Sequence, residues 1–153
     1  MKTIAVTVGL LQRDGKVLLC QRKRGARYEL KWEFPGGKVE PGETPEQAVA
    51  RELSEELSVN IRGAELIEKS RASYSDGNTY DVSYFRVTSF AGEPRNNVFE
   101  QIRWVGLQEL SEFDILEGNK SFVDALVRAS TLKAAASHPS LEKSRRGLNP
   151  NPD

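Results

Sequence analysis

One short segment in the first third of the chain marks the start of a helix, and this feature constrains the fold most. Thr44 can cap the helix, Pro45 suits its first turn, and Gln47 completes a Thr-x-x-Gln capping box. The apolar residues that follow recur at helical spacing, at Val49, Leu53 and Leu57. The segment therefore predicts a helix from Thr44 to about Leu57, with one apolar face that packs on a sheet.

Strand patterns precede this helix. Residues 3–12 and 16–22 are rich in β-branched residues and leucine, and they flank an Asp-Gly dipeptide, which is typical of a two-residue hairpin turn. The mixed, polar segment 23–34 is expected to form a loop that returns to a short strand before the Pro-Gly-Gly sequence at 35–37.

Strands also follow the helix, and a second helix ends the pattern. Residues 61–74 and 79–90 alternate polar with β-branched or aromatic residues around "SDGN", which predicts a longer hairpin, and "QIRWVGL" predicts a further strand. Helical spacing of apolar residues predicts a helix over 119–130. The order of elements favours an α/β (α+β) fold, a sandwich with a mixed β-sheet between helices. We expect one domain, residues 1–130, and a C-terminal tail, 131–153, where apolar periodicity ends.

Charge and cysteine content exclude several classes of function. Lys and Arg total 22 and Asp and Glu total 22, so no strong global field draws the chain to nucleic acid, and no DNA duplex is expected as a partner. The single cysteine, Cys20, cannot form an intrachain disulfide and lies in an apolar run typical of a core residue. The start of the chain lacks the pattern of a signal peptide, and no stretch is long enough to cross a bilayer. We therefore expect a cytoplasmic protein with no membrane partner.

Three glutamates share one side of the predicted central helix, at Glu52, Glu55 and Glu56. Carboxylates spaced three and four residues apart repel one another, so the cluster destabilises the helix unless a cation joins it. Carboxylate oxygens suit Mg²⁺ or Mn²⁺, and a bound Mg²⁺ usually keeps positions open for substrate phosphates. The cluster therefore indicates phosphoryl chemistry, and the alternative is a solvated helix face.

The residues around the glutamates extend the pattern to Gly-x5-Glu-x7-Arg-Glu-Leu-x-Glu-Glu over residues 37–56. This pattern resembles the signature of the Nudix hydrolases. Within that family the chain is most similar to the MutT-type nucleoside triphosphate pyrophosphohydrolases, through "EFPGGK" at 33–38, "GETPEQAV" at 42–49 and "GEP" at 92–94. The resemblance implies a Nudix-type αβα sandwich in residues 1–130 that hydrolyses a nucleoside diphosphate linked to another group.

The resemblance implies roles for the residues that match the motif. The metal ligands would be carboxylates and a backbone carbonyl, from Gly36, Glu52, Glu55 and Glu56. The structural residues of the motif would be Gly37, Glu43 and Arg51, the last two as an ion pair that holds the loop against the helix.

Catalysis would fall to the motif and to one loop residue. The resemblance implies Glu52, Glu55 and Glu100 as catalytic residues, with either Glu52 or Glu100 as the general base. Glu100 could also be an extra metal ligand. It is explained equally well as a solvent-facing residue at the start of a strand.

Three further residues match substrate-contacting positions of MutT-type enzymes. Arg22 and Lys38 would bind phosphate oxygens, although each is as well explained as a surface charge. Asn119 stands where a MutT-type enzyme has an asparagine that reads the O6 edge of guanine, which implies a guanine preference. The alternative for Asn119 is the N-cap of the last helix.

One position departs from the family pattern. Ser58 stands where the family has the glycine that ends the helix in a left-handed conformation. We expect Asn60 to take the left-handed position instead.

The leading hypothesis is a Mg²⁺-dependent enzyme, with Mn²⁺ possible, that cleaves a nucleoside 5′-triphosphate to the monophosphate and pyrophosphate. The substrate would be a free nucleotide or the 5′-triphosphate end of an RNA. The basic residues of the tail could contact the RNA backbone, and the alternative is that they only make the surface more soluble: Lys133, Lys143, Arg145 and Arg146. The alternatives are hydrolysis of a nucleoside diphosphate sugar such as ADP-ribose, and a nucleotide-binding sensor without catalysis. No oligomeric state is predicted.

Overall fold

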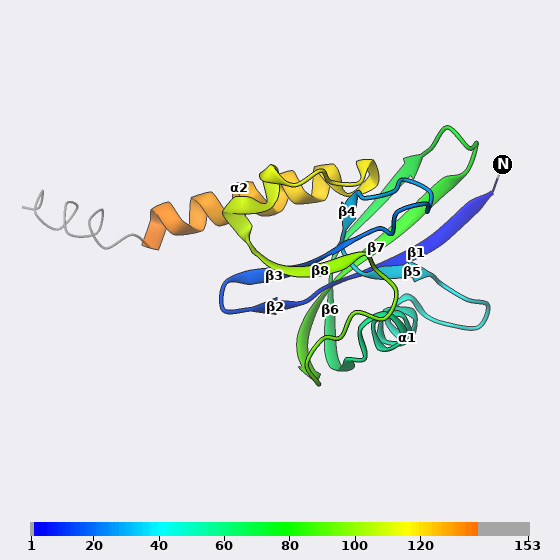
Figure 1. Cartoon of the computed structure of the whole chain (residues 1–153), viewed down its shortest axis with the longest axis horizontal. Helices are drawn as coiled ribbons and strands as arrows, with labels where there is room; N and C mark the ends of the chain where they lie inside the picture. Colours follow the sequence, from blue (N-terminus) through cyan, green and yellow to red (C-terminus); the bar gives the residue numbers. More distant parts are fainter. Residues whose placement is uncertain (1, 138–153) are drawn as a thin grey trace, which may run out of the picture.

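The computed structural model describes residues 2–137 and places two four-stranded sheets between two helices (Figure 1). The first sheet has the strand order β5 (Gly36–Lys38), β1 (Thr3–Leu10), β7 (Thr79–Ala91) and β6 (Asn60–Ser73). β1 pairs parallel with β7, whereas the pairs β1–β5 and β6–β7 are antiparallel. The first sheet is therefore mixed.

The second sheet is built around β3. Its strands are β2 (Gln12–Arg13), β3 (Lys16–Gln21), β4 (Trp32–Glu33) and β8 (Gln101–Gly106). β3 pairs antiparallel with each of the other three. Two short 3₁₀ helices, η1 (Leu107–Glu112) and η2 (Glu117–Asn119), follow β8 and lead into the last helix.

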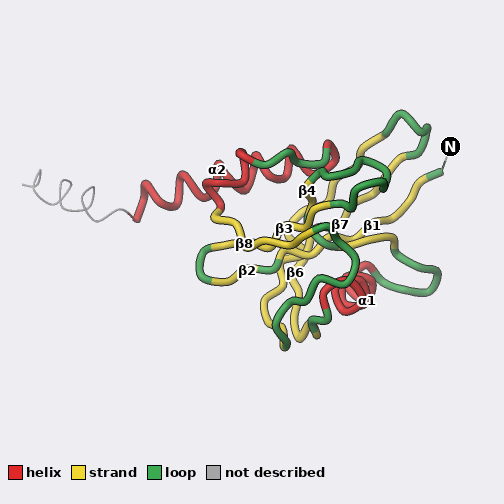
Figure 2. Tube along the Cα trace, in the orientation of Figure 1, coloured by secondary structure: helices red, strands yellow, loops and turns green. Residues whose placement is uncertain are grey.

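The two long helices cover opposite sides of the strands, α1 (Pro45–Leu57) on one side and α2 (Lys120–Ser137) on the other (Figure 2). Each helix has its own hydrophobic cluster: Leu53 of α1 packs in the same cluster as Leu18, and Phe122 of α2 in the same cluster as Leu19. Successive strand residues point to opposite faces, so neighbouring leucines of β3 serve different clusters. The result is an αβα arrangement. Of the helices that the structure describes, none is long and apolar enough to cross a membrane.

The predicted fold class and both hairpins are confirmed. Asp14 and Gly15 have consecutive positive φ angles of 53° and 75°, as the tight turn between β2 and β3 requires. The single strand expected over 3–12 is wrong, because the chain changes sheets at Leu11. Leu10 and Leu11 are both buried, in different clusters, and after them the chain continues as β2 of the second sheet.

The end of α1 also differs from expectation. Ser58 itself is left-handed, with φ 58° and ψ 29°, and Asn60 begins β6, so the expectation for Asn60 is wrong. The Asn97 side-chain amide donates to Ser58 Oγ at 2.9 Å and to the Glu55 carbonyl at 3.0 Å. Contacts from the loop before β8 thus compensate for a serine where a glycine is usual.

The last helix runs past its predicted end at 130 and reaches Ser137. The sequence "KAAAS" continues the helix because alanine has the highest helix propensity. The division into a domain and a tail stays a prediction, because residues 138–153 lie outside the described part of the chain. Three of the four basic tail residues named above fall there.

Candidate active site

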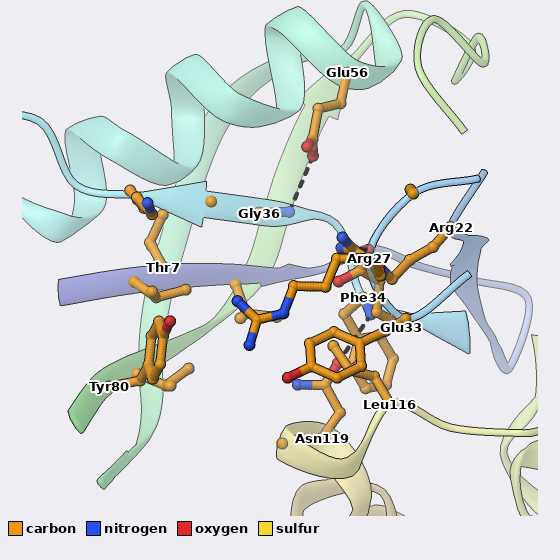
Figure 3. A pocket seen from close by; sticks show the side chains of 18 of the residues that line it. Thr7, Arg22, Arg27, Glu33, Phe34, Gly36, Glu56, Tyr80, Leu116 and Asn119 are labelled. Atoms are coloured by element: carbon orange, nitrogen blue, oxygen red, sulfur yellow. Dashed lines mark hydrogen bonds and ion pairs between the residues drawn. The ribbon is translucent and has the colours of Figure 1, made fainter. Parts of the chain in front are cut away.

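A cavity of about 680 Å³ lies where the two sheets meet (Figure 3). Strands β1, β5 and β7 of the first sheet supply part of its wall, and Glu33 and Phe34 at the end of β4 supply another part. The rest comes from the loop after β3, the turn between β6 and β7, the segment before β8, Glu56 of α1 and the residues before α2. Figure 3 shows Glu56 and Asn119 on opposite sides of this cavity.

Glu56 is the α1 glutamate that lines the cavity. Its Oε1 accepts a hydrogen bond from the Gly36 N–H at 3.0 Å. Burial of Leu53 and Leu57 fixes the rotation of α1 that aims Glu56 at β5. Burial, together with the nearby charge of Glu52, raises the pKa of Glu56 to about 8. A bound cation would offset the cost of burying this charge.

Arg51 holds the other carboxylates of the motif. Its Nε and one terminal nitrogen donate to the two Glu43 oxygens at 2.6 and 2.9 Å, and it also donates to the Lys38 carbonyl at 3.0 Å. These hydrogen bonds lower the pKa of Glu43 to about 2. The other terminal nitrogen lies 3.0 Å from Glu52 Oε1 and 3.4 Å from Glu55 Oε2. Arg51 therefore joins the loop after β5 to the helix.

Gly37 allows the Glu52 carboxylate to lie directly on the backbone of β5. A Cβ at Gly37 would lie 2.5 Å from the Glu52 carboxyl carbon, well inside a normal contact between carbon atoms. A side chain at this position would therefore displace the Glu52 carboxylate.

The donor atoms along β5 and α1 suit a hard divalent cation. The candidate ligands are the oxygens of Glu52, Glu55 and Glu56 with the Gly36 carbonyl, and such oxygens are what Mg²⁺ and Mn²⁺ prefer. Within residues 2–137, no three His, Cys, Asp or Glu side chains are already arranged to hold a metal ion. Two of the glutamates are held by Arg51 instead, so both would have to turn to reach a cation bound at Glu56. The chemistry of the donor set fits, and the side-chain arrangement differs from a formed site.

Arg22 lines the cavity and is held in place from two sides. It donates to Glu33 Oε2 at 3.1 Å and to the Arg27 carbonyl at 2.6 Å. Burial raises the pKa of Glu33, and the charge of Arg22 opposes this shift. Sequence reasoning missed Glu33, although it is the first residue of "EFPGGK" and thus stands within the resemblance.

Lys38 and Asn119 also line the cavity. Asn119 is only 8% exposed, and its Oδ1 accepts a hydrogen bond from the Phe34 N–H at 3.4 Å. This oxygen is therefore directed at the end of β4 and not at the first turn of α2, which a helix cap would require.

Glu100 is exposed and immediately precedes β8. Its Oε1 accepts a hydrogen bond from the Arg24 N–H at 3.1 Å, which ties the loop after β3 to this point. Its neighbour Phe99 lines the cavity, whereas Glu100 is not among the described lining residues. The side-chain hydrogen bond of Glu100 therefore goes to the loop after β3.

A group of aromatic and charged residues in the cavity wall was missed by sequence reasoning. The rings of Tyr74 and Tyr80 meet edge to face at 4.9 Å, and Arg27 lies 3.7 Å from Asp76. The ion pair joins the loop after β3 to the turn between β6 and β7. The two tyrosines flank "SDGN", so an available signal was an aromatic residue on each side of that turn.

A family model described as the NUDIX domain matches residues 1–126 of the chain. The chain belongs to the Nudix family. The 8-oxo-dGTP diphosphatase of Escherichia coli K12 is 33% identical over 129 residues, which cover 84% of this chain and 99% of the relative. The CTP pyrophosphohydrolase of the same strain is 30% identical over 135 residues, which cover 88% of this chain and 99% of the relative.

A comparison with solved structures gives the same family. The MutT NUDIX hydrolase from Burkholderia pseudomallei is 27% identical and matches with a TM-score of 0.70, covering 80% of this chain and 96% of that chain. This Nudix hydrolase is therefore MutT-like in sequence and in fold, which confirms the family, fold class and enzyme class expected from the motif. Nudix hydrolases generally use a divalent metal ion, in keeping with the donor set along β5 and α1.

Proposed function

We propose that this Nudix hydrolase is a Mg²⁺-dependent pyrophosphohydrolase that converts a nucleoside 5′-triphosphate and water to the nucleoside monophosphate and pyrophosphate. The observation that carries the proposal is one cavity that combines the half-buried carboxylate of Glu56 with the cations Arg22 and Lys38. A triphosphate needs both, because its oxygens bind cationic side chains directly and bind carboxylates only through a metal ion. Mn²⁺ would serve the same ligands.

The cationic side chains of the cavity would bind the phosphates, and the carboxylates would bind the metal ion. Arg22 and Lys38 bind phosphate oxygens and hold the chain of phosphates in line for attack by water. Glu52, Glu55 and Glu56, with the Gly36 carbonyl, hold the metal ion, which would neutralise charge on the phosphates. Gly37 and the Glu43–Arg51 pair keep β5 and α1 at the required separation. The general base would be Glu52, or Glu100 if the loop that carries it approaches the substrate.

The nucleobase is proposed to be guanine. The two relatives are named for different bases, 8-oxo-dGTP and CTP, so relatedness alone does not select one. Asn119 supports guanine because a side-chain amide can donate to O6 and accept from N1–H. The substrate is a free nucleotide or the 5′ end of an RNA, since both present the same triphosphate to the same residues.

Pyrophosphate release with Mg²⁺ tests the proposal. The substrates are the four nucleoside triphosphates, a triphosphate-ended RNA and ADP-ribose. Glu56→Gln should lower the rate by about 100-fold or more, because several kcal/mol of charge stabilisation depend on the metal. Activity that survives Glu56→Gln would overturn the metal assignment.

The substrate panel separates the alternatives. Activity on ADP-ribose alone would overturn the triphosphate proposal, and binding without turnover of any substrate would indicate a sensor. Equal concentrations of GTP and of a GTP-initiated RNA distinguish the two triphosphate sources by their kcat/KM values.

A further inference from the structure

We propose that Tyr84 is a positioning residue that locks the side-chain amide of Asn119 in one orientation, and so sets the order of hydrogen-bond donor and acceptor that the cavity accepts from a nucleobase. The inference rests on the proposed function in so far as the cavity takes a nucleotide. Tyr84 is not among the described lining residues of the cavity, so it acts through Asn119.

The direction of each hydrogen bond follows from its neighbour. The Phe34 N–H can only donate, so the Asn119 atom 3.4 Å from it must be the acceptor Oδ1. Nδ2 then lies 3.2 Å from the Tyr84 hydroxyl oxygen and donates to it. The Tyr84 hydroxyl in turn donates its own hydrogen to the Gly118 carbonyl at 3.2 Å. Each of these three hydrogen bonds thus pairs one donor with one acceptor.

Reversing the amide would break two of these contacts. Nδ2 would then oppose the Phe34 N–H, donor against donor, where both residues are buried, with Phe34 3% and Asn119 8% exposed. Tyr84 is 1% exposed and its ring stacks on Phe122 with centroids 4.0 Å apart, so the hydroxyl cannot move aside. Without the hydroxyl, Nδ2 has one fewer partner and the preference for one orientation weakens.

A side-chain amide fixed in one orientation discriminates between two base edges, whereas an amide that is free to turn over does not. One Nδ2 hydrogen and one Oδ1 lone pair of Asn119 remain unused by this chain of hydrogen bonds. Guanine offers an acceptor at O6 beside a donor at N1, whereas adenine offers a donor at N6 beside an acceptor at N1. An amide held in one orientation favours one order, and an amide that turns over can serve both.

Binding of GMP and AMP to the full-length protein, measured by titration calorimetry, tests the lock without requiring turnover. The wild-type protein should bind the two with Kd values that differ by about tenfold or more, the discrimination of one good bidentate contact. Tyr84→Phe keeps the ring and its stacking on Phe122, and should bring the two Kd values to within about threefold of each other. Thr131→Val is the control: it removes a hydroxyl that donates to the Val127 carbonyl within α2, Thr131 is not among the described lining residues of the cavity, and the variant should keep the wild-type ratio.

The same comparison in an Asn119→Ala background shows whether the hydroxyl acts through the amide. Tyr84→Phe should then leave the Kd ratio unchanged. The proposal is overturned if the wild type does not discriminate, if neither nucleotide binds, if Tyr84→Phe keeps the full ratio, or if it lowers the ratio equally without Asn119. If the protein discriminates between GMP and AMP as expected but releases no pyrophosphate, the proposed function is wrong and the role of Tyr84 is still supported.

Discussion

At the scale of single residues, the half-buried carboxylate of Glu33 explains how Arg22 is held ready for a phosphate. A guanidinium held by one carboxylate and one carbonyl has lost its rotational freedom before the substrate arrives. Its remaining N–H groups are free to be aimed at the cavity. Glu33 therefore acts on the substrate through Arg22.

Glu33→Gln should raise KM for the triphosphate by about three- to tenfold and change kcat little, because a charge-assisted bond to Arg22 becomes a neutral one and substrate binding loses its preset partner. Steady-state kinetics measure both constants. Asp114→Asn is the matched control: it neutralises a carboxylate 2.7 Å from Lys31 on the exposed surface and should leave KM unchanged. An unchanged KM in Glu33→Gln would refute the role.

The site residues that could be predicted from the sequence are those that lie close together along the chain. Glu52, Glu55 and Glu56 share a helix, so their spacing along the chain fixes their spacing in space. Tyr84 and Asn119 meet from positions 35 residues apart, and Glu33 meets Arg22 only because β3 and β4 pair. Such contacts depend on sheet register, which the residue pattern of a single strand does not contain.

At the scale of elements, α1 is fixed by a local cap at its start and by contacts from a distant loop at its end. The capping box of Thr44 and Gln47, predicted from the sequence, is present at its start. The left-handed Ser58 at its end was not predicted, because the compensating partner, Asn97, comes from a distant loop. Local sequence signals were enough to predict α1, whereas the conformation of its last residues depends on tertiary contacts.

The Glu43–Arg51 pair should make the stability of this unit depend on acid. The pKa of Glu43 falls from 4.5 to about 2 in the folded protein, so the unfolded chain binds more protons between these values. The stabilisation is therefore complete above about pH 5 and is lost as the pH falls toward 2. Glu43→Gln should lower the urea midpoint at pH 7, and its difference from wild type should shrink as the pH falls through this window.

Urea unfolding of both proteins across the acid range measures this difference. Glu46→Gln, at an exposed carboxylate in the first turn of α1, gives the baseline for removing one negative charge from this end of the helix. A difference between Glu43→Gln and wild type that stays constant down to pH 2 would argue against the pair as its source.

At the scale of the whole molecule, the cavity depends on both sheets at once. The chain passes from the first sheet to the second at Leu11, and the Arg27–Asp76 ion pair joins a loop of the second sheet to a hairpin of the first. The sequence predicted the layers but placed all strands in one sheet. A change of sheet within one run of apolar residues has no signature in local periodicity, since Leu10 and Leu11 are equally apolar.

A ligand that contacts both sheets should therefore stabilise the entire fold. The gain in the free energy of unfolding should require the metal ion. At a ligand concentration about 100 times Kd the gain is about 2.7 kcal/mol, or about 5–10 °C in melting temperature for a chain of this size. Thermal unfolding with Mg²⁺ and a triphosphate whose α–β bridge is a methylene group measures it. EDTA or Glu56→Gln should remove most of the shift, because the glutamates held by Arg51 have no cation to turn toward. A shift of the same size in EDTA would mean that Arg22 and Lys38 bind the phosphates without the metal, and the carboxylates of α1 would then need another explanation.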